Sequence, residues 1–228
     1  MKETGGTEAQ KRAAGESAAD AVADGMVVGL GTGSTAAHAI RAIGRAVDRG
    51  LDARGVPTSF QSRELAKEMG IPIAGLDEVE GIDLAIDGAD QFSGPHLVKG
   101  GGAAHAREKI VDAAADRLLV VADPSKAADR LDHPVPIEVL PDARTTVSDA
   151  VTALGGSPTL RTADRKDGPV VTDNGNLVLD CAFGDIERPA ELATDLAGLP
   201  GAVEHGLFVG MADEIHVGRE DGVEIRRF

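Results

Sequence analysis

The sequence predicts an α/β fold with a doubly wound parallel sheet and a second, smaller α+β domain. In the first half of the chain, short unbroken apolar runs alternate with segments of helical spacing, which is typical of parallel strands covered on both faces. Beyond Asp123 the runs become shorter and are separated by prolines and turn residues, which favours antiparallel strands. The chain has 228 residues, enough for one or two domains, and its apolar fraction of 42% supplies a sizeable core.

The first half of the chain repeats the order strand, turn, helix. The opening helix is predicted from alanines at helical spacing, and the strand at 26–30 from a short apolar run. The predicted elements are helices at 7–24, 36–47, 61–69 and 103–115 and strands at 26–30, 54–58, 71–74, 82–87 and 118–122. Helices that connect successive strands in this way indicate a parallel sheet.

The second half has shorter elements joined by tight turns. The predicted elements are strands at 135–139, 158–161, 170–172 and 177–180 and helices at 146–154 and 189–197. We expect residues 131–204 to form the small α+β domain. The tail has apolar stretches at 207–211 and 214–217, and we expect it to return to the first domain. Residues 1–130 and 205–228 are therefore predicted to form a Rossmann-like domain.

The charge composition restricts the kinds of partner. The chain has 38 acidic and 23 basic side chains and a formal net charge of −15, which argues against binding to nucleic acid or to an anionic membrane surface. Only 7 of the basic residues are lysines, and Asp outnumbers Glu by 23 to 15. We expect such an acidic, lysine-poor surface in a protein from a salt-rich cytoplasm.

The sequence predicts neither a disulfide nor a metal site. Cys181 is the single cysteine, so an intrachain disulfide and a multi-cysteine metal site are excluded. The histidines are scattered, without a metal-ligand spacing. The first 25 residues lack the apolar core of a signal peptide, and no apolar run approaches the roughly 18 residues that a membrane span needs. A cytoplasmic location is therefore expected.

The first candidate site is the turn formed by Gly31, Thr32, Gly33, Ser34 and Thr35, between a predicted strand and a predicted helix. Such a turn offers backbone N–H groups and the positive end of the helix dipole, and both suit a phosphate group. The alternative is a plain helix cap, which needs no ligand. The turn is not the dinucleotide pattern G-x-G-x-x-G, because Ser34 replaces the third glycine, and it is not a Walker A loop, which ends in Gly-Lys-Ser/Thr.

The second candidate site is formed by Asp87, Gly88, Ala89 and Asp90, at the end of the predicted strand at 82–87. Two carboxylates at the carboxyl end of a strand are placed to face a ligand cleft, where they can transfer protons or bind hydroxyl groups. The alternative is an Asp-containing turn with local capping.

The third candidate site is Lys99 followed by Gly100, Gly101 and Gly102, just before a predicted helix. Three successive glycines are unfavourable for chain entropy, which indicates that the backbone closely approaches another group. Glu108 falls at the edge of the apolar stripe of that helix, a position suited to a general base. The alternative for Glu108 is an ordinary surface residue.

The fourth candidate site contains Lys126, just beyond the predicted strand at 118–122. A lysine at the end of a strand adds a point charge that can bind an anion. The alternative is a solvated lysine in a turn.

With these motifs in this order, the chain resembles ribose-5-phosphate isomerase of the A type over nearly its whole length. The resemblance rests on Gly31–Thr35, Asp87–Asp90, Lys99–Gly102, Arg107–Lys109, Ala122–Lys126, Thr172–Asn176 and Gly206–Phe208. No single segment is diagnostic, but seven in order are highly specific. One departure is Gln91, where the family usually has Glu, and this puts a charge role at that position in doubt.

The resemblance implies an aldose–ketose isomerisation that interconverts ribose 5-phosphate and ribulose 5-phosphate through an enediolate, without a metal or organic cofactor. It implies that Glu108 moves a proton between C2 and C1. Asp87, supported by Asp90, would assist ring opening and proton transfer between the oxygens, and Lys99 with the backbone of Gly100–Gly102 would stabilise the oxyanion. The implied substrate-binding residues are Gly31 to Thr35, Asp87 to Asp90, Lys99 to Gly102 and Lys126. The family also implies a homodimer or homotetramer.

Two other functions are weighed against this one. A regulatory module that binds a sugar phosphate without turnover would keep the phosphate-binding turn but would need no base at Glu108. The presence of Glu108 and of both Asp87 and Asp90 favours the enzyme. A dinucleotide-dependent dehydrogenase is disfavoured by the glycine spacing.

Overall fold

The computed structural model describes residues 5–164 and 167–228, which form two compact units. The antiparallel-sheet unit comprises Asp90–Ala106 and Ala128–Gly210. The parallel-sheet unit comprises the other described residues, including Arg107–Ala127 and Met211–Phe228. We expected residues 90–106, 128–130 and 205–210 in the first domain, but they belong to the antiparallel-sheet unit.

The parallel-sheet unit is built on a six-stranded sheet in the order β13-β12-β6-β3-β1-β2. Its strands are β1 (Met26–Leu30), β2 (Ala53–Pro57), β3 (Leu84–Gly88), β6 (Leu118–Ala122), β12 (Glu214–Arg219) and β13 (Gly222–Arg227). Neighbouring strands are parallel except at the edge, where β13 pairs with β12 in the antiparallel direction. The predicted parallel sheet is confirmed, and the tail adds a hairpin to it.

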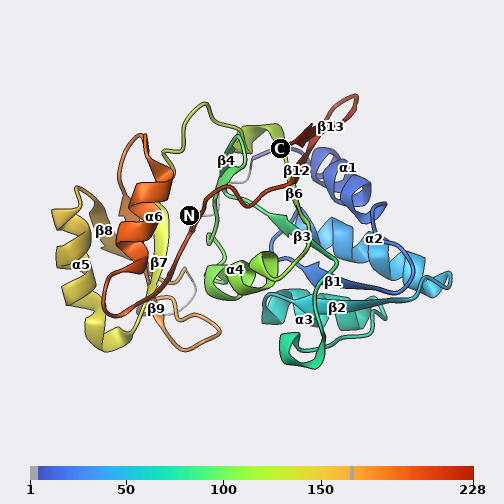
Figure 1. Ribbon diagram of the computed structural model, residues 1–228, viewed down its shortest axis with the longest axis horizontal. Coiled ribbons are helices and arrows are strands. Elements are labelled where there is room, and N and C mark those ends of the chain that lie inside the picture. Colours follow the sequence, from blue (N-terminus) through green and yellow to red (C-terminus); the bar gives the residue numbers. More distant parts are fainter. Residues whose placement is uncertain (1–4, 165–166) are drawn as a thin grey trace. The chain divides into compact units, whose positions relative to one another are not determined.

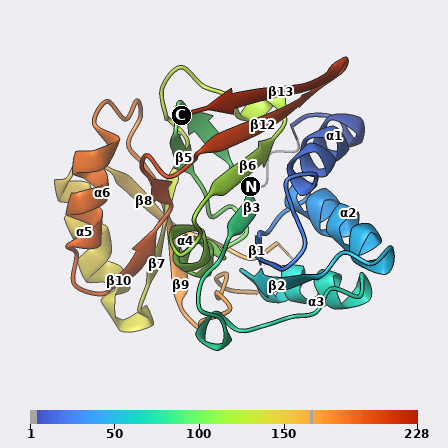
Figure 2. The ribbon, with the colours of Figure 1, turned by 45° about the vertical axis from the view of Figure 1, so that its right-hand side comes forward.

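Helices cover both faces of this sheet, as Figure 2 shows. They are α1 (Glu8–Ala19), α2 (Ala36–Asp48), α3 (Phe60–Glu68), the part of α4 (His105–Ala113) that follows Ala106, and the short helices η1 (Leu76–Glu78) and η2 (Pro124–Lys126). On one face, Val28 and Leu30 of β1 pack in a core with α1 and α2. On the other face, Val27 packs with Val111 of α4. The alternation along β1 explains why the strand has no polar side.

The order of the strands reverses between β1 and β3. These two strands are neighbours, and Leu30 pairs with Ile86. From β1 the chain continues to β2 on one side, and from β3 it continues to β6 on the other side. In sheets of this type, ligands bind where the order reverses, outside the carboxyl ends of the strands. The segments that follow β1 and β3 are therefore the first place to look for a site.

The antiparallel-sheet unit contains a four-stranded sheet in the order β10-β7-β9-β8 and a three-stranded sheet in the order β11-β5-β4. Strands β7, β8 and β9 are labelled in Figure 1. The strands are β4 (Gln91–Ser93), β5 (His96–Val98), β7 (Val135–Val139), β8 (Ser157–Leu160), β9 (Leu177–Ala182), β10 (Ala202–His205) and β11 (Leu207–Phe208). The helices are α5 (Arg144–Ala153), α6 (Pro189–Ala197) and η3 (Pro141–Ala143). Val147 of α5 and Leu196 of α6 pack in one core with Ile137 and Leu179 of the sheet.

Some predicted elements differ in the structure. The predicted strand at 71–74 is reduced to a single bridge at Ile73, and the one at 170–172 to a single bridge at Val171. Strands β4 and β5 were not predicted, because three-residue strands are too short to show a periodicity. The fourth predicted helix begins at His105 rather than at Ala103, whose φ of 59° is left-handed.

The helices of the described chain are short. The longest of them, α2, has 13 residues. None of the helices in the described residues has both the length and the apolar character required to cross a membrane.

Candidate active site

The turn after β1 and the aspartate at the end of β3 are joined by hydrogen bonds. Asp87 is 1% exposed, and its Oδ1 accepts the N–H of Thr32 at 3.0 Å and that of Gly88 at 2.6 Å. Gly31 leaves no room for a side chain, since a Cβ there would lie 2.2 Å from Oδ1 of Asp87. The structure therefore brings together two of the predicted motifs, which are 55 residues apart in the sequence.

These contacts determine which N–H groups of the turn a ligand can reach. Those of Gly31 and Thr32 already donate to acceptors within the protein. Among the described residues, no acceptor is found for the N–H groups of Gly33, Ser34 and Thr35, and Thr35 makes no side-chain cap of α2. The capacity of the turn to bind a phosphate therefore lies in residues 33–35, at the positive end of the α2 dipole.

A cluster of hydroxyl groups, which the sequence reasoning missed, supports Thr32. The Oγ1 of Thr32 lies 2.8 Å from Oγ1 of Thr58 and 2.7 Å from Oγ of Ser59. Ser59 is the N-cap of α3, and it exchanges hydrogen bonds with Ser62. Thr58, Ser59 and Ser62 are all buried. The available signal was that these hydroxyl residues follow β2, whose carboxyl end lies next to that of β1.

Glu108 and Arg107 lie on α4. Glu108 is 4% exposed, so it is not the ordinary surface residue that was its alternative interpretation. The guanidinium of Arg107 stacks over the ring of Phe60, with Cζ 5.3 Å from the ring centroid. A buried carboxylate must be hydrogen-bonded or ion-paired, and buried ionisable groups gather at functional sites, so the position of Glu108 agrees with a functional role.

Lys126 is the last residue of the short helix η2, which begins directly after the buried Asp123. Oδ1 of Asp123 accepts the N–H of Ser125 at 2.9 Å and its hydroxyl at 2.6 Å, which fixes the turn. Gly6 packs closely against the same Asp123 side chain. A Cβ added at Gly6 would lie only 2.4 Å from the Cβ of Asp123. Lys126 is therefore held on an ordered turn at the end of β6, while its side chain is partly exposed.

The other predicted site residues lie in the antiparallel-sheet unit. Lys99 follows β5 and is 2% exposed, and its Nζ lies 5.3 Å from the centroid of the Phe208 ring. A buried ammonium group is costly in free energy, which makes Lys99 a candidate for a functional charge. Oδ2 of Asp90 accepts the N–H of Gly101 at 2.6 Å. Asp90 and the glycine segment therefore form a second hydrogen-bonded group, within this unit.

The glycines of this segment are required by the protein itself. A Cβ at Gly100 would lie 2.7 Å from Nδ1 of His105, and one at Gly101 would lie 2.6 Å from Oδ1 of Asp90. The close approach predicted from the three glycines is thus, for the first two, an approach to the protein's own side chains. Ala103, with φ of 59°, is the only non-glycine residue of the described chain with positive φ. Such strain is often found at functional sites.

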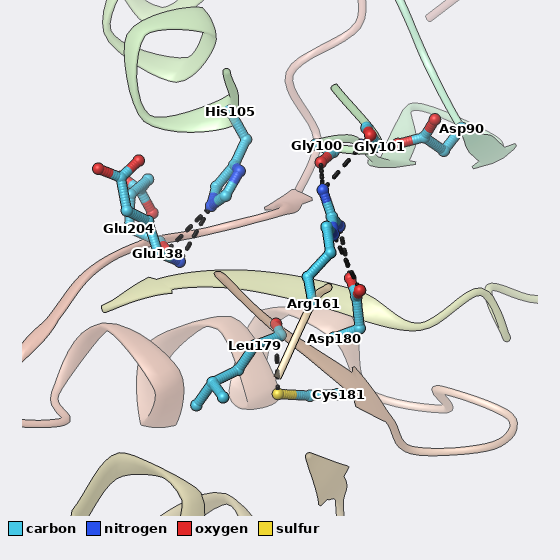
Figure 3. Close-up of polar contacts among 10 residues, drawn as sticks. All are labelled: Asp90, Gly100, Gly101, His105, Glu138, Arg161, Leu179, Asp180, Cys181 and Glu204. Atoms are coloured by element: carbon cyan, nitrogen blue, oxygen red, sulfur yellow. Dashed lines mark hydrogen bonds and ion pairs between the residues drawn. The ribbon is translucent and has the colours of Figure 1, made fainter. Parts of the chain in front are cut away.

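Arg161, which the sequence reasoning also missed, holds the glycine segment from its carbonyl side (Figure 3). Its Nη1 donates to the carbonyl oxygens of Gly100 at 2.8 Å and Gly101 at 3.3 Å. Its Nε and Nη2 both donate to the carboxylate of Asp180. No local sequence pattern indicates this arrangement, because 61 residues separate Arg161 from Gly100.

Gln91, the departure from the family pattern, has a structural role in this chain. Its Nε2 donates to the carboxylate of Asp132 at 2.5 Å, and its Oε1 accepts the N–H groups of Asp132 and His133 at 2.8 and 2.9 Å. A carboxylate at this position has no N–H to donate to Asp132. The amide therefore suits its neighbours better than a charge does.

The motif at Thr172–Asn176 also has a structural role. Oε1 of the buried Glu138 accepts the hydroxyl of Thr172 at 2.9 Å and the amides of Asn174 and Asn176 at 3.1 and 2.7 Å. These three bonds fix the turn before β9. In the same region, Nε2 of the buried His105 accepts the N–H of Glu138 at 3.1 Å (Figure 3). Within the described residues, no group of three or more His, Cys, Asp or Glu side chains is arranged to hold a metal ion.

Comparison with known proteins gives one consistent result. The family model for ribose 5-phosphate isomerase A (phosphoriboisomerase A) matches residues 54–222. The chain is 72% identical over 222 residues to ribose-5-phosphate isomerase A of Haloarcula marismortui, covering 97% of each chain. It is 69% identical over 226 residues to that of Natronomonas pharaonis, covering 99% of this chain and 100% of the relative.

Solved structures agree with the sequence comparisons. The ribose 5-phosphate isomerase A of Methanocaldococcus jannaschii superposes with a TM-score of 0.91 at 42% identity, covering 96% of this chain and 98% of that one. A D-ribose-5-phosphate isomerase in complex with phospho-erythronic acid superposes with a TM-score of 0.95 at 41% identity, covering 98% and 100%.

Proposed function

The chain belongs to the ribose 5-phosphate isomerase A family, and from this premise we propose how its residues act. The protein is an aldose–ketose isomerase that interconverts D-ribose 5-phosphate and D-ribulose 5-phosphate through an enediolate. This reaction belongs to the non-oxidative pentose phosphate pathway. It needs a base for a proton next to a carbonyl, a group that moves protons between two oxygens, and positive charge or N–H donors where the enediolate forms.

Glu108 is the base in this proposal. Its carboxylate removes the proton from C2 of the open-chain aldose, and the electron pair moves to form the enediolate. Glu108 then returns the proton to C1, which completes the ketose. The burial of Glu108 supports this role. While the carboxyl group carries the proton from C2 to C1, burial limits the loss of that proton to bulk water.

Asp87 assists ring opening and transfers a proton between the two oxygens, with Asp90 in a supporting role. Oδ1 of Asp87 is held by two backbone N–H groups, so the orientation of its carboxylate is fixed before substrate arrives. Lys99 and the backbone of Gly100–Gly102 stabilise the oxyanion. The N–H of Gly101 is already donated to Asp90, so within the glycine segment the N–H groups of Gly100 and Gly102 serve this purpose.

The phosphate of the substrate binds at residues 33–35, whose N–H groups begin α2, and Lys126 adds positive charge. Phosphate binding holds the reacting carbons in place without taking part in the chemistry. The single observation that carries the proposal is the hydrogen bond from Thr32 to Asp87, because it links the phosphate-binding turn to a catalytic carboxylate. A sensor without turnover has no need of this link or of a buried Glu108.

The proposal extends to assembly and location. We propose a homodimer or homotetramer that acts in the cytoplasm on a small sugar phosphate, without a metal or organic cofactor. Sedimentation velocity on the purified chain measures the assembly state. Activity that survives EDTA supports the metal-free reaction, and inhibition that added divalent metal reverses contradicts it.

The decisive experiment is incubation with ribose 5-phosphate in D2O. An isomerase that works through an enediolate produces ribulose 5-phosphate with deuterium at C1, in proportion to exchange between the base and solvent. NMR measures both the ketose and the deuterium. Tight binding of ribose 5-phosphate without any ketose would instead identify the non-catalytic regulatory module.

A further inference from the structure

The side chain of Arg161 lies between a carboxylate and the glycine segment of the antiparallel-sheet unit, as Figure 3 shows. It is 14% exposed, and Asp180 binds it through two guanidinium nitrogens. The third nitrogen, Nη1, donates to the carbonyl oxygens of Gly100 and Gly101. A planar guanidinium can make all of these bonds at once, whereas a lysine ammonium is a point charge without this fork geometry.

Each of these two carbonyls belongs to a peptide group whose N–H lies on the following residue. The carbonyl of Gly100 shares its peptide with the N–H of Gly101, which donates to Oδ2 of Asp90 at 2.6 Å. The carbonyl of Gly101 shares its peptide with the N–H of Gly102. A hydrogen bond from a cation to a carbonyl polarises the peptide and makes its N–H a stronger donor. Arg161 therefore acts on both N–H groups through the peptide bonds.

The segment is held from both sides. Asp90 fixes the N–H of Gly101, and Arg161 fixes the carbonyls of Gly100 and Gly101. Glycine is the most flexible residue, so a run of three would otherwise sample many conformations. With these bonds in place, the direction of the Gly102 N–H is set before substrate binds.

We propose that Arg161 is a positioning residue for the isomerisation, which orients and polarises the peptide of Gly102 so that its N–H stabilises the enediolate oxygen. Asp180 holds the guanidinium in the required plane. This inference rests on the proposed function, in which the backbone of Gly100–Gly102 stabilises the oxyanion. Arg161 does not touch the substrate in this scheme, and its effect is on the transition state.

The test compares Arg161→Met, Arg161→Lys and Asp180→Asn with wild type, and Arg188→Met is the matched control on the same unit. Arg188 directly precedes α6, its side chain is 75% exposed, and it pairs with Glu191 of that helix. Loss of a complete oxyanion donor lowers kcat by about 10²–10³-fold, and here a donor is weakened rather than removed, so we expect Arg161→Met to lower kcat about 10–100-fold. Arg161→Lys and Asp180→Asn should have smaller effects, and Arg188→Met should have none.

Three binding measurements separate positioning from general damage to the fold. In Arg161→Met we expect KM for ribose 5-phosphate and the inhibition constant of inorganic phosphate to stay within about threefold of wild type, because the phosphate site is left intact. Phospho-erythronic acid carries a carboxylate on a phosphorylated chain, and its affinity should fall in proportion to kcat/KM. Circular dichroism and thermal unfolding monitor the fold.

The inference is overturned if Arg161→Met keeps wild-type kcat, or if KM and the phosphate inhibition constant rise as much as kcat falls. If Arg161→Met does not fold, Asp180→Asn decides: unchanged kcat in that variant overturns the inference, and a lower kcat with unchanged KM supports it. Wild-type turnover is established first by the D2O experiment. A wild type without turnover overturns the proposed function as well, whereas an active wild type with an equally active Arg161→Met overturns only this inference.

Discussion

The backbone N–H of Thr32 donates a 3.0 Å hydrogen bond to Oδ1 of Asp87. This bond joins the carboxyl ends of β1 and β3, the two strands between which the strand order of the sheet reverses. In the proposed function, a substrate that binds the turn through its phosphate is therefore held by the same segment that orients the proposed catalytic carboxylate. Orientation of this kind converts binding energy into rate.

The substitution Glu108→Gln should lower kcat by about 10²–10⁴-fold, the usual contribution of a general base. Glutamine has nearly the same shape as glutamate but cannot accept the C2 proton. The measurement is the initial rate of ribulose 5-phosphate formation at saturating substrate. Glu64→Gln, at an exposed position of α3 that pairs with Lys67, is the control and should keep wild-type activity. Near-wild-type turnover in Glu108→Gln would remove Glu108 from the role of base.

The substitution Thr58→Val should raise KM for ribose 5-phosphate by about three- to tenfold, the equivalent of one hydrogen bond. Valine has the shape of threonine but leaves the hydroxyl of Thr32 without its 2.8 Å partner. Thr58→Ser keeps the hydroxyl and should restore KM close to the wild-type value. Steady-state kinetics on the three proteins checks this. Equal KM in Thr58→Val and wild type would show that the hydroxyl cluster does not support the turn.

His216 should make the protein less stable as the pH falls through the range near 6.5. Burial lowers the pKa of His216 below its ordinary value, although the nearby Glu214 acts in the opposite direction. The unfolded chain therefore takes up a proton at higher pH than the folded one. This contribution to stability is fully present above the unfolded pKa of about 6.5 and is lost as the pH falls toward the folded pKa.

The check on His216 is thermal unfolding from pH 8 to pH 5 for wild type and His216→Gln. Glutamine does not titrate in this range, so the variant should lose less stability on acidification than wild type. Ser17, whose Oγ lies 2.9 Å from Nδ1 of His216, is retained in both proteins. Parallel pH profiles of the two proteins would show that His216 does not contribute to the acid sensitivity.

Cys181 should be unreactive toward thiol reagents in the folded protein. Burial, and secondarily the charge of Asp180, raises the pKa of this thiol to about 12, so almost no thiolate exists at pH 8. Reaction with Ellman's reagent should be negligible under native conditions and should reach one equivalent in guanidinium chloride. Rapid labelling of the native protein would show that β9 opens readily.

The stability of the protein should rise with KCl concentration. The formal charge of −15 gives net repulsion between acidic groups, and the screening length falls from about 10 Å at 0.1 M salt to about 3 Å at 1 M. The melting temperature at 0.1 M and 2 M KCl measures the effect, with sucrose as a control for non-ionic stabilisation. Full stability in dilute buffer would contradict this prediction.

The elements and motifs that lie close together in the chain were predictable from the sequence. A buried strand, a glycine turn and the start of a helix follow one another around Gly31. A short segment of sequence is therefore enough to predict an anion-binding turn there. Asp87 and Lys126 were proposed as site residues in the same way, because they follow apolar runs. The element boundaries were less predictable, because short strands such as β4 and β5 have no measurable periodicity.

Other properties were decided only by the tertiary structure. The sequence predicts that Thr32 lies in a phosphate-binding turn, but the pairing of β1 with β3 commits its N–H to Asp87 and leaves the N–H groups of residues 33–35 available. The pairing of β1 with β2 places Thr58 against Thr32, and the fold of the antiparallel-sheet unit places Arg161 against Gly100. The physical reason is that a hydrogen bond depends on distance and direction in space. These are set by contacts between segments far apart in the chain, for which the local sequence carries no signal.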